Sequence, residues 1–100
     1  MPSIEDIFVE LSDVFDPELM VNIVDLGLVY DVRVEKKTVD IEMTLTSPGC
    51  PMGPQIKRDV IEHLKMFDDV KKVNVEFVWN PPWQPEMMSE EAKLELGYPI

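Results

Sequence analysis

The residues whose types and spacing suggest chemistry lie between Thr44 and Gln55, around the only cysteine of the chain. This stretch reads Thr-Leu-Thr-Ser-Pro-Gly-Cys-Pro-Met-Gly-Pro-Gln and places Cys50 among prolines and glycines. Each proline fixes its own φ and restricts the residue before it, so the loop is predicted to be stiff. A helical pattern follows the loop, and a thiol at the start of a helix ionises more readily than a free one. Cys50 is therefore predicted to be reactive and partly exposed.

The sequence leaves three uses of the Cys50 thiol open. A free cysteine often serves only as a small, buried apolar side chain. A nucleophile needs a base, and the only histidine, His63, would lie on the order of 15 Å away along a helix that starts near Pro51. As a metal ligand, one thiolate falls short of the four that iron–sulfur clusters usually have. A second chain, a carboxylate, a small thiol or a partner protein would then complete the ligand set.

Other polar residues could share a site with this thiol. Asp16 and Glu18 flank a proline, where they either cap a turn of helix or offer carboxylate oxygens to a ligand. A carboxylate close to Cys50 would raise the pKa of the thiol and so oppose the effect of the helix start. Thr46 and Ser47 either cap the turn that follows them or hydrogen-bond a ligand beside the thiol.

Two tryptophans bracket the proline-rich segment 80–82. Trp79 ends an alternating stretch and is expected to point inward as the last residue of a strand. Trp83 follows no such pattern on its proline-stiffened loop. We therefore expect Trp83 to contact a partner protein or to lie as a lid over a nearby site.

The spacing of apolar residues predicts the elements that must position these groups. Helical spacing marks a first helix capped by Ser3, a second helix that ends at residues 68–69, and a last helix capped by Ser89. Period-two alternation predicts a hairpin around the polar break at residues 36–38 and a third strand over residues 73–79. The order helix-strand-strand-helix-strand-helix is typical of a small two-layer α+β domain with a three-stranded mixed sheet, here as one domain over residues 1–100.

The segment between the first helix and the first strand is irregular. Pro17 to Met20 is predicted to form a short turn of helix, because an aspartate precedes the proline. Residues 22–27 are predicted to form a loop with Gly27 as its hinge.

Composition restricts the class of partner. The chain has 100 residues, of which 45% are hydrophobic, and its net charge is −11. Nucleic acid and anionic membranes need a basic surface, so a basic protein or a metal ion is the better partner. A single cysteine suits a reducing compartment, and the sequence shows neither a signal peptide nor a long apolar span. We therefore expect a cytoplasmic protein that binds no nucleic acid and no membrane.

Three stretches of the chain resemble one family, in order. They are Asp-Pro-Glu-Leu with the segment 22–30, Met-Thr-Leu-Thr-Ser-Pro-Gly-Cys-Pro at 43–51, and Val-Trp-Asn-Pro-Pro-Trp at 78–83 followed by Met-Ser at 88–89. These motifs look like those of the metal–sulfur cluster biosynthetic family, the SufT-like accessory domains of iron–sulfur cluster assembly that were once described only as a domain of unknown function. The resemblance covers nearly the whole chain and implies the fold of an iron–sulfur cluster assembly domain.

The resemblance also implies a function and a site. It implies an accessory factor, not an enzyme, that assists iron–sulfur cluster assembly or delivery to client proteins through a reactive cysteine in an acidic pocket. The reactive cysteine of the family maps onto Cys50, its threonine onto Thr46, and its acidic element onto Asp16 and Glu18. No tightly bound cofactor is expected, only a transient iron–sulfur cluster or iron. The expected partners are the assembly machinery and client apoproteins, and a homodimer would supply a second thiolate.

Two rival functions remain open on the sequence. An enzyme with Cys50 as its nucleophile would need a base within hydrogen-bond reach of the sulfur. An adaptor would act through Trp83 and the acidic surface without metal chemistry, and it would tolerate Cys50→Ser.

Overall fold

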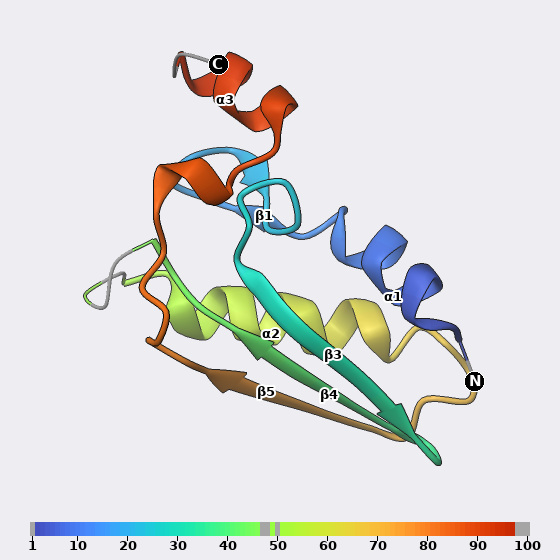
Figure 1. Ribbon diagram of the computed structural model, residues 1–100. Helices are drawn as coiled ribbons and strands as arrows, with labels where there is room; N and C mark the ends of the chain where they lie inside the picture. Colours follow the sequence, from blue (N-terminus) through green and yellow to red (C-terminus); the bar gives the residue numbers. More distant parts are fainter. Residues whose placement is uncertain (1, 47–48, 50, 98–100) are drawn as a thin grey trace.

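The computed structural model describes residues 2–46, 49 and 51–97, which form two layers with an extension at one end (Figure 1). The predicted order of helices and strands is confirmed, and a small strand pair is added to it. The elements of the described residues are α1 (Ile4–Leu11), β1 (Phe15–Asp16), β2 (Val21–Asn22), β3 (Val29–Glu35), β4 (Thr38–Met43), α2 (Gly53–Leu64), β5 (Lys72–Phe77), a 3-10 turn η1 (Pro85–Met87) and α3 (Glu90–Leu96).

The main sheet is mixed, as predicted, with strand order β3-β4-β5. β3 and β4 form the predicted antiparallel hairpin, whose turn contains Lys36 at a φ of 54°. β4 and β5 are parallel, with Ile41 opposite Val75, and α2 makes the crossover between them that parallel strands require. The carboxyl ends of β4 and β5 therefore meet at the same edge of the sheet.

One face of the sheet packs against α1 and α2, and the other carries polar side chains (Figure 1). On the polar face, Arg33 contacts Glu42 at 3.1 Å and Asp31 at 3.4 Å. The two helices are joined by His63 Nδ1 and Glu10 Oε2, which lie 2.7 Å apart. The fully buried side chains of the core include Ile7, Leu11, Ile23, Leu26, Leu28, Val39, Ile41, Met43, Ile56, Val60 and Leu64.

The segment from Pro17 to Met20 does form the predicted single turn, closed by a hydrogen bond from the Met20 N–H to the Asp16 carbonyl oxygen at 2.8 Å. The turn continues into no helix and connects β1 to β2, with Met20 at a φ of 59°. Two predicted boundaries were wrong. α2 ends at Leu64 and does not reach residues 68–69. β5 ends at Phe77, opposite Met43, because β4 offers no partner beyond that residue.

Trp79 was consequently misassigned as an inward strand residue. It lies past the end of β5, and 44% of its surface is exposed. Its ring stacks on Phe77 with centroids 6.3 Å apart. Alternation along the sequence cannot reveal where a partner strand stops, and that end point decides which way Trp79 faces.

The chain after β5 packs against the turn between β2 and β3. The Trp83 indole donates a hydrogen bond to the Leu26 carbonyl oxygen at 2.7 Å, and the Ser89 N–H donates to the Asp25 carbonyl oxygen at 2.7 Å. Gly27, the predicted hinge, has a φ of +78° and lies directly against the Met87 backbone. Tyr30 adds a hydrogen bond from its hydroxyl to the Pro81 carbonyl oxygen at 2.9 Å. These contacts hold the C-terminal segment and α3 over one end of the domain.

Gly27→Ala should destabilise the domain far more than Gly97→Ala. Both glycines have a left-handed φ, which costs about 1–2 kcal/mol for other residues, but only at Gly27 would a Cβ also collide with the Met87 carbonyl oxygen. With that collision, we expect Gly27→Ala to lower the free energy of unfolding by about 2–5 kcal/mol. Urea denaturation of the two variants measures the difference. Equal losses would show that the close approach of Gly27 to Met87 does not constrain the fold.

Candidate functional site

The loop that carries Cys50 connects the carboxyl end of the central strand β4 to the start of α2 (Figure 1). This is the sheet edge where the carboxyl ends of parallel strands meet, and open α/β sheets bind ligands at that edge. Cys50 and Ser47 themselves lie outside the described residues, so their predicted exposure and roles stay predictions. Of the described loop residues, Thr46 is half-buried, and Gly49 and Pro51 are exposed.

The start of α2 can favour a negative charge. Its N-cap residue, Met52, makes no side-chain capping hydrogen bond, and no acidic residue lies in the first turn. The free N–H groups and the dipole of a helix start attract anions, so this position suits a thiolate better than most of a chain with a net charge of −11. Gly53 packs tightly here, because a Cβ on it would lie 3.0 Å from Leu45 Cδ1.

Asp16 is buried with 1% of its surface exposed, and its side chain organises the turn between β1 and β2. Its Oδ1 accepts hydrogen bonds from the Glu18 N–H at 2.8 Å and the Leu19 N–H at 3.3 Å. The capping role that the sequence left open is therefore present for Asp16, around a turn that continues into no helix. Glu18, in contrast, is exposed to solvent.

Thr44 is a buried polar residue that no sequence pattern singled out. Its side chain is fully buried, and its hydroxyl oxygen has no hydrogen-bond partner among the described residues. Burial raises the pKa of the neighbouring Tyr30 above its ordinary value of 10.0. Period-two alternation after Met43 places Thr44 on the outer face, so only the tertiary structure reveals its burial.

Trp83 is half-buried and packs against the core, with its indole N–H bonded to Leu26. Trp79 is the more exposed of the two tryptophans. The expectation that Trp83 contacts a partner stays a prediction, and any such contact would use the part of the ring that the core leaves open.

In the part of the chain that the structure describes, no three His, Cys, Asp or Glu side chains come close enough to hold a metal ion together. The predicted metal ligands Asp16 and Glu18 are adjacent in the β1–β2 turn, but Cys50 falls outside that part. The ligand set of Cys50, Asp16 and Glu18 therefore stays a prediction.

Comparison with known proteins decides the family. The model of the family described as "Iron-sulfur cluster assembly protein" matches residues 4–77. The chain belongs to this family. A relative from Staphylococcus aureus, "Fe-S protein maturation auxiliary factor SufT", is 51% identical over 84% of the chain and 97% of its own length. A second relative, "Fe-S protein maturation auxiliary factor YitW" from Bacillus subtilis, is 49% identical over 93% of the chain and 92% of its own length.

Two solved structures share the fold of this chain. A protein of Bacillus anthracis described as a domain of unknown function, DUF59, superposes with a TM-score of 0.88 at 48% identity, covering 93% of the chain and 90% of its own. A conserved hypothetical protein of Thermotoga maritima gives a TM-score of 0.83 at 39% identity, covering 96% of the chain and 95% of its own. Within the described residues of the present family member, no helix has the length and apolar character needed to cross a membrane.

Asp16→Ala should destabilise the protein, whereas Asp16→Asn should largely preserve its stability. Alanine leaves the Glu18 and Leu19 N–H groups without their acceptor, at a cost of about 1–2 kcal/mol. Asparagine keeps an oxygen at the same position and removes only the charge. Thermal unfolding of the two variants beside the wild type measures this difference. A large loss in Asp16→Asn would mean that the charge itself, and not the hydrogen bonds, stabilises the turn.

Proposed function

We propose that this protein is an accessory factor that assists the assembly of iron–sulfur clusters or their delivery to client proteins. The observation that carries the proposal is the identity of 51% and 49% with two proteins named Fe-S protein maturation auxiliary factors, over nearly the full length of both. The named relatives are described as auxiliary factors, and we expect no turnover of a small substrate by this chain either. The cluster or iron is then the cargo of the protein.

Cys50 is proposed to act as a transient ligand or as a thiol that links the protein to a partner. A soft thiolate is the ligand that iron–sulfur chemistry prefers. The start of α2 supports the thiolate form, since the Met52 side chain makes no capping hydrogen bond and the first turn has no carboxylate. One thiolate per chain cannot hold a cluster firmly, so a second chain, a partner or a small thiol would supply the remaining ligands. Loss of these ligands would later release the cluster.

Asp16 and Glu18 are proposed to have different roles in this site. Asp16 Oδ1 binds the backbone N–H of Glu18 at 2.8 Å, so Asp16 acts as a positioning residue for the turn that presents Glu18. Glu18 has an exposed carboxylate that can form the acidic wall beside the cargo. Thr46 and Ser47 are proposed to orient the loop around Cys50, and Thr46 is half-buried at the end of β4.

Cys50→Ala should abolish cluster binding while the fold stays intact. Anaerobic reconstitution with iron and sulfide should give the wild type a labile cluster, with less than one per monomer unless a dimer or an added thiol completes the ligands. Visible absorption, iron content and mass under native conditions measure the cluster and its stoichiometry. A robust cluster on a demonstrated monomer, or one that survives Cys50→Ala, would assign the ligands to other residues.

A cell-based assay separates this role from the adaptor alternative. In cells that lack the protein, complementation by Cys50→Ser should fail to restore the activity of iron–sulfur enzymes, whereas Glu5→Gln, an exposed control in α1, should restore it. Asp16→Asn keeps the turn, so its behaviour tests whether the buried charge contributes to function beyond stability. Full complementation by Cys50→Ser would favour an adaptor that needs no thiol.

A further inference from the structure

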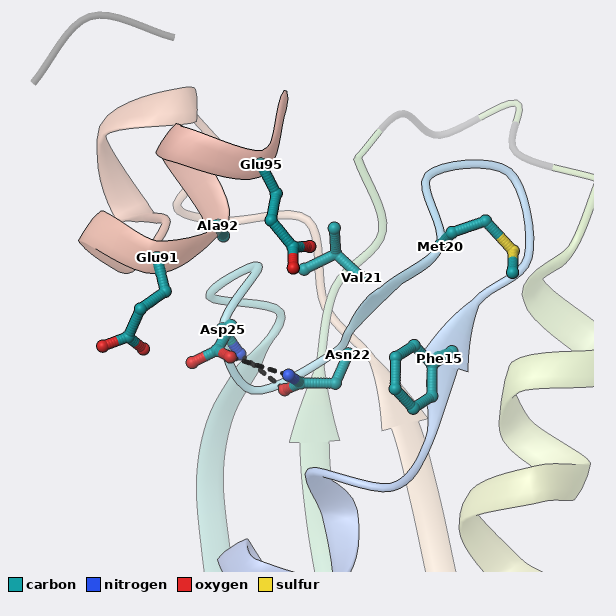
Figure 2. Close-up of a pocket in the computed structure, with 8 residues that line it drawn as sticks. All are labelled: Phe15, Met20, Val21, Asn22, Asp25, Glu91, Ala92 and Glu95. Carbon is teal, nitrogen blue, oxygen red and sulfur yellow. Dashed lines mark hydrogen bonds between the residues drawn. The ribbon is translucent and has the colours of Figure 1, made fainter. Parts of the chain in front are cut away.

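A cavity of about 210 Å³ lies between α3 and the β1–β2 strand pair (Figure 2). Its apolar lining includes Phe15, Met20 and Val21 from the strand pair and Ala92 from α3. Phe15 and Met20 are unusually exposed for apolar residues, at 47% and 71%. Exposed apolar side chains beside a cavity are typical of an interaction surface and not of a hydrophobic core. None of these residues belongs to the loop of Cys50.

The polar lining of the cavity is strongly acidic. Glu91 and Glu95 extend from α3 and Asp25 extends from the turn after β2, all three around the same space (Figure 2). No lysine or arginine lines the cavity, and among the described residues neither glutamate forms an ion pair. Any partner that enters this space from solvent therefore meets carboxylates that still lack a counter-charge.

The spacing of the two glutamates is unfavourable in the isolated protein, although the dipole at the start of α3 favours the charge of Glu91. Glu91 and Glu95 are four residues apart on one helix, where like charges repel. Glu95 is also the residue before the last of α3, close to the negative end of the helix dipole. A cation between the two carboxylates would relieve both effects. The repulsion between the glutamates is independent of the size and apolar lining of the cavity. It favours an occupant with a positive charge.

The walls of the cavity are fixed before any partner binds. The Ser89 N–H donates to the Asp25 carbonyl oxygen at 2.7 Å and so ties the start of α3 to the turn after β2. The Asn22 amide donates to Asp25 Oδ2 at 2.7 Å, and the Asp25 N–H donates to Asn22 Oδ1 at 2.9 Å (Figure 2). The Asp25 carboxylate is therefore held in place with lone pairs to spare for a further donor.

We propose that this cavity binds an arginine side chain of a partner protein, presented between apolar residues. Its volume of about 210 Å³ equals that of about seven waters at roughly 30 Å³ each and lies below the roughly 300–1,000 Å³ of small-molecule sites, so one long side chain fits better than a cofactor. The aliphatic stem would lie beside Met20, which is exposed, and the planar guanidinium would reach the carboxylates and the Phe15 ring. Apolar neighbours in the partner would cover Phe15 and Met20.

To test this proposal, the full chain is titrated at low salt with a tripeptide, acetyl-Leu-Arg-Leu-amide. Two-dimensional NMR spectra record the protein resonances at each peptide concentration. We expect shifts in the resonances of Phe15, Val21, Asn22, Asp25 and Ala92 that saturate with peptide concentration. The same peptide with citrulline, which has the shape of arginine without its charge, should not produce them. No shifts at these residues, or equal binding of the citrulline peptide, would overturn the proposal.

Matched variants separate a defined site from general attraction to an acidic protein. The double variant Glu91→Gln with Glu95→Gln should weaken binding of the arginine peptide about tenfold, because two exposed charge pairs together contribute about 1.4 kcal/mol. The double variant Glu86→Gln with Glu90→Gln removes the same charge from exposed residues outside the cavity and should bind as the wild type does. Circular dichroism checks that both variants fold. Equal weakening in the two variants, or equally tight binding of a lysine peptide, would contradict an arginine site.

Discussion

The packing of the C-terminal segment on the turn between β2 and β3 is the constraint on which the rest of the structure depends. Three backbone-directed contacts form it: the Trp83 indole on Leu26, the Ser89 N–H on Asp25, and the close approach of Gly27 to Met87. Two of them require a particular residue type, since the Trp83 indole reaches across as a long, flat donor and only glycine leaves room for the Met87 carbonyl, whereas the Ser89 N–H is a backbone donor. Without this packing, Tyr30 would lose its bond to Pro81 and α3 would lose its place.

The same packing produces features that lie far apart in the sequence. It buries Met88 and Ala92 at one end of the domain, and it brings Tyr30 next to Pro81 and Met87. It also sets Glu91 and Glu95 opposite Asp25, which makes one wall of the acidic cavity. The cavity is thus a consequence of how the C-terminal segment is held. Glu91 and Glu95 make none of the contacts that hold it, so their mutual repulsion does not prevent α3 from packing there.

The distribution of charge gives different parts of the surface different electrostatic potentials. A chain with a net charge of −11 repels anions over most of its surface. The start of α2 is an exception, because its N-cap residue Met52 makes no side-chain capping hydrogen bond and its first turn has no acidic residue. A thiolate near the start of α2 and a basic partner side chain in the acidic cavity would therefore respond to opposite local potentials. The proposed cargo site and the proposed docking cavity share the β1–β2 turn, since Glu18 lies between Phe15 and Met20, but Glu91 and Glu95 belong to the cavity alone.

The sequence by itself determined the layout of the elements and the capping residues. Hydrophobic periodicity predicted α1, the β3–β4 hairpin and α2, and the Ser3–Asp6 capping box formed as its spacing predicts. The motifs around Asp16, Cys50 and Trp83 identified the family that the comparisons confirmed. Caps and periodicity depend on residues that are close together in the chain, and the family motifs depend on the order of residue types. Both can therefore be recognised in a single sequence.

The tertiary structure decided what depends on distant partners. The end of β5, and with it the exposure of Trp79, follows from where β4 stops. Asp16 could cap a helix or bind a ligand, and the antiparallel pairing of Phe15 with Asn22 turned its segment into a strand connection that its carboxylate caps. Thr44 is buried although its position in the alternation points outward. For Trp79 the deciding strand is distant in the chain; for Asp16 the pairing partners Phe15 and Asn22 are near, but local propensity does not say whether they pair.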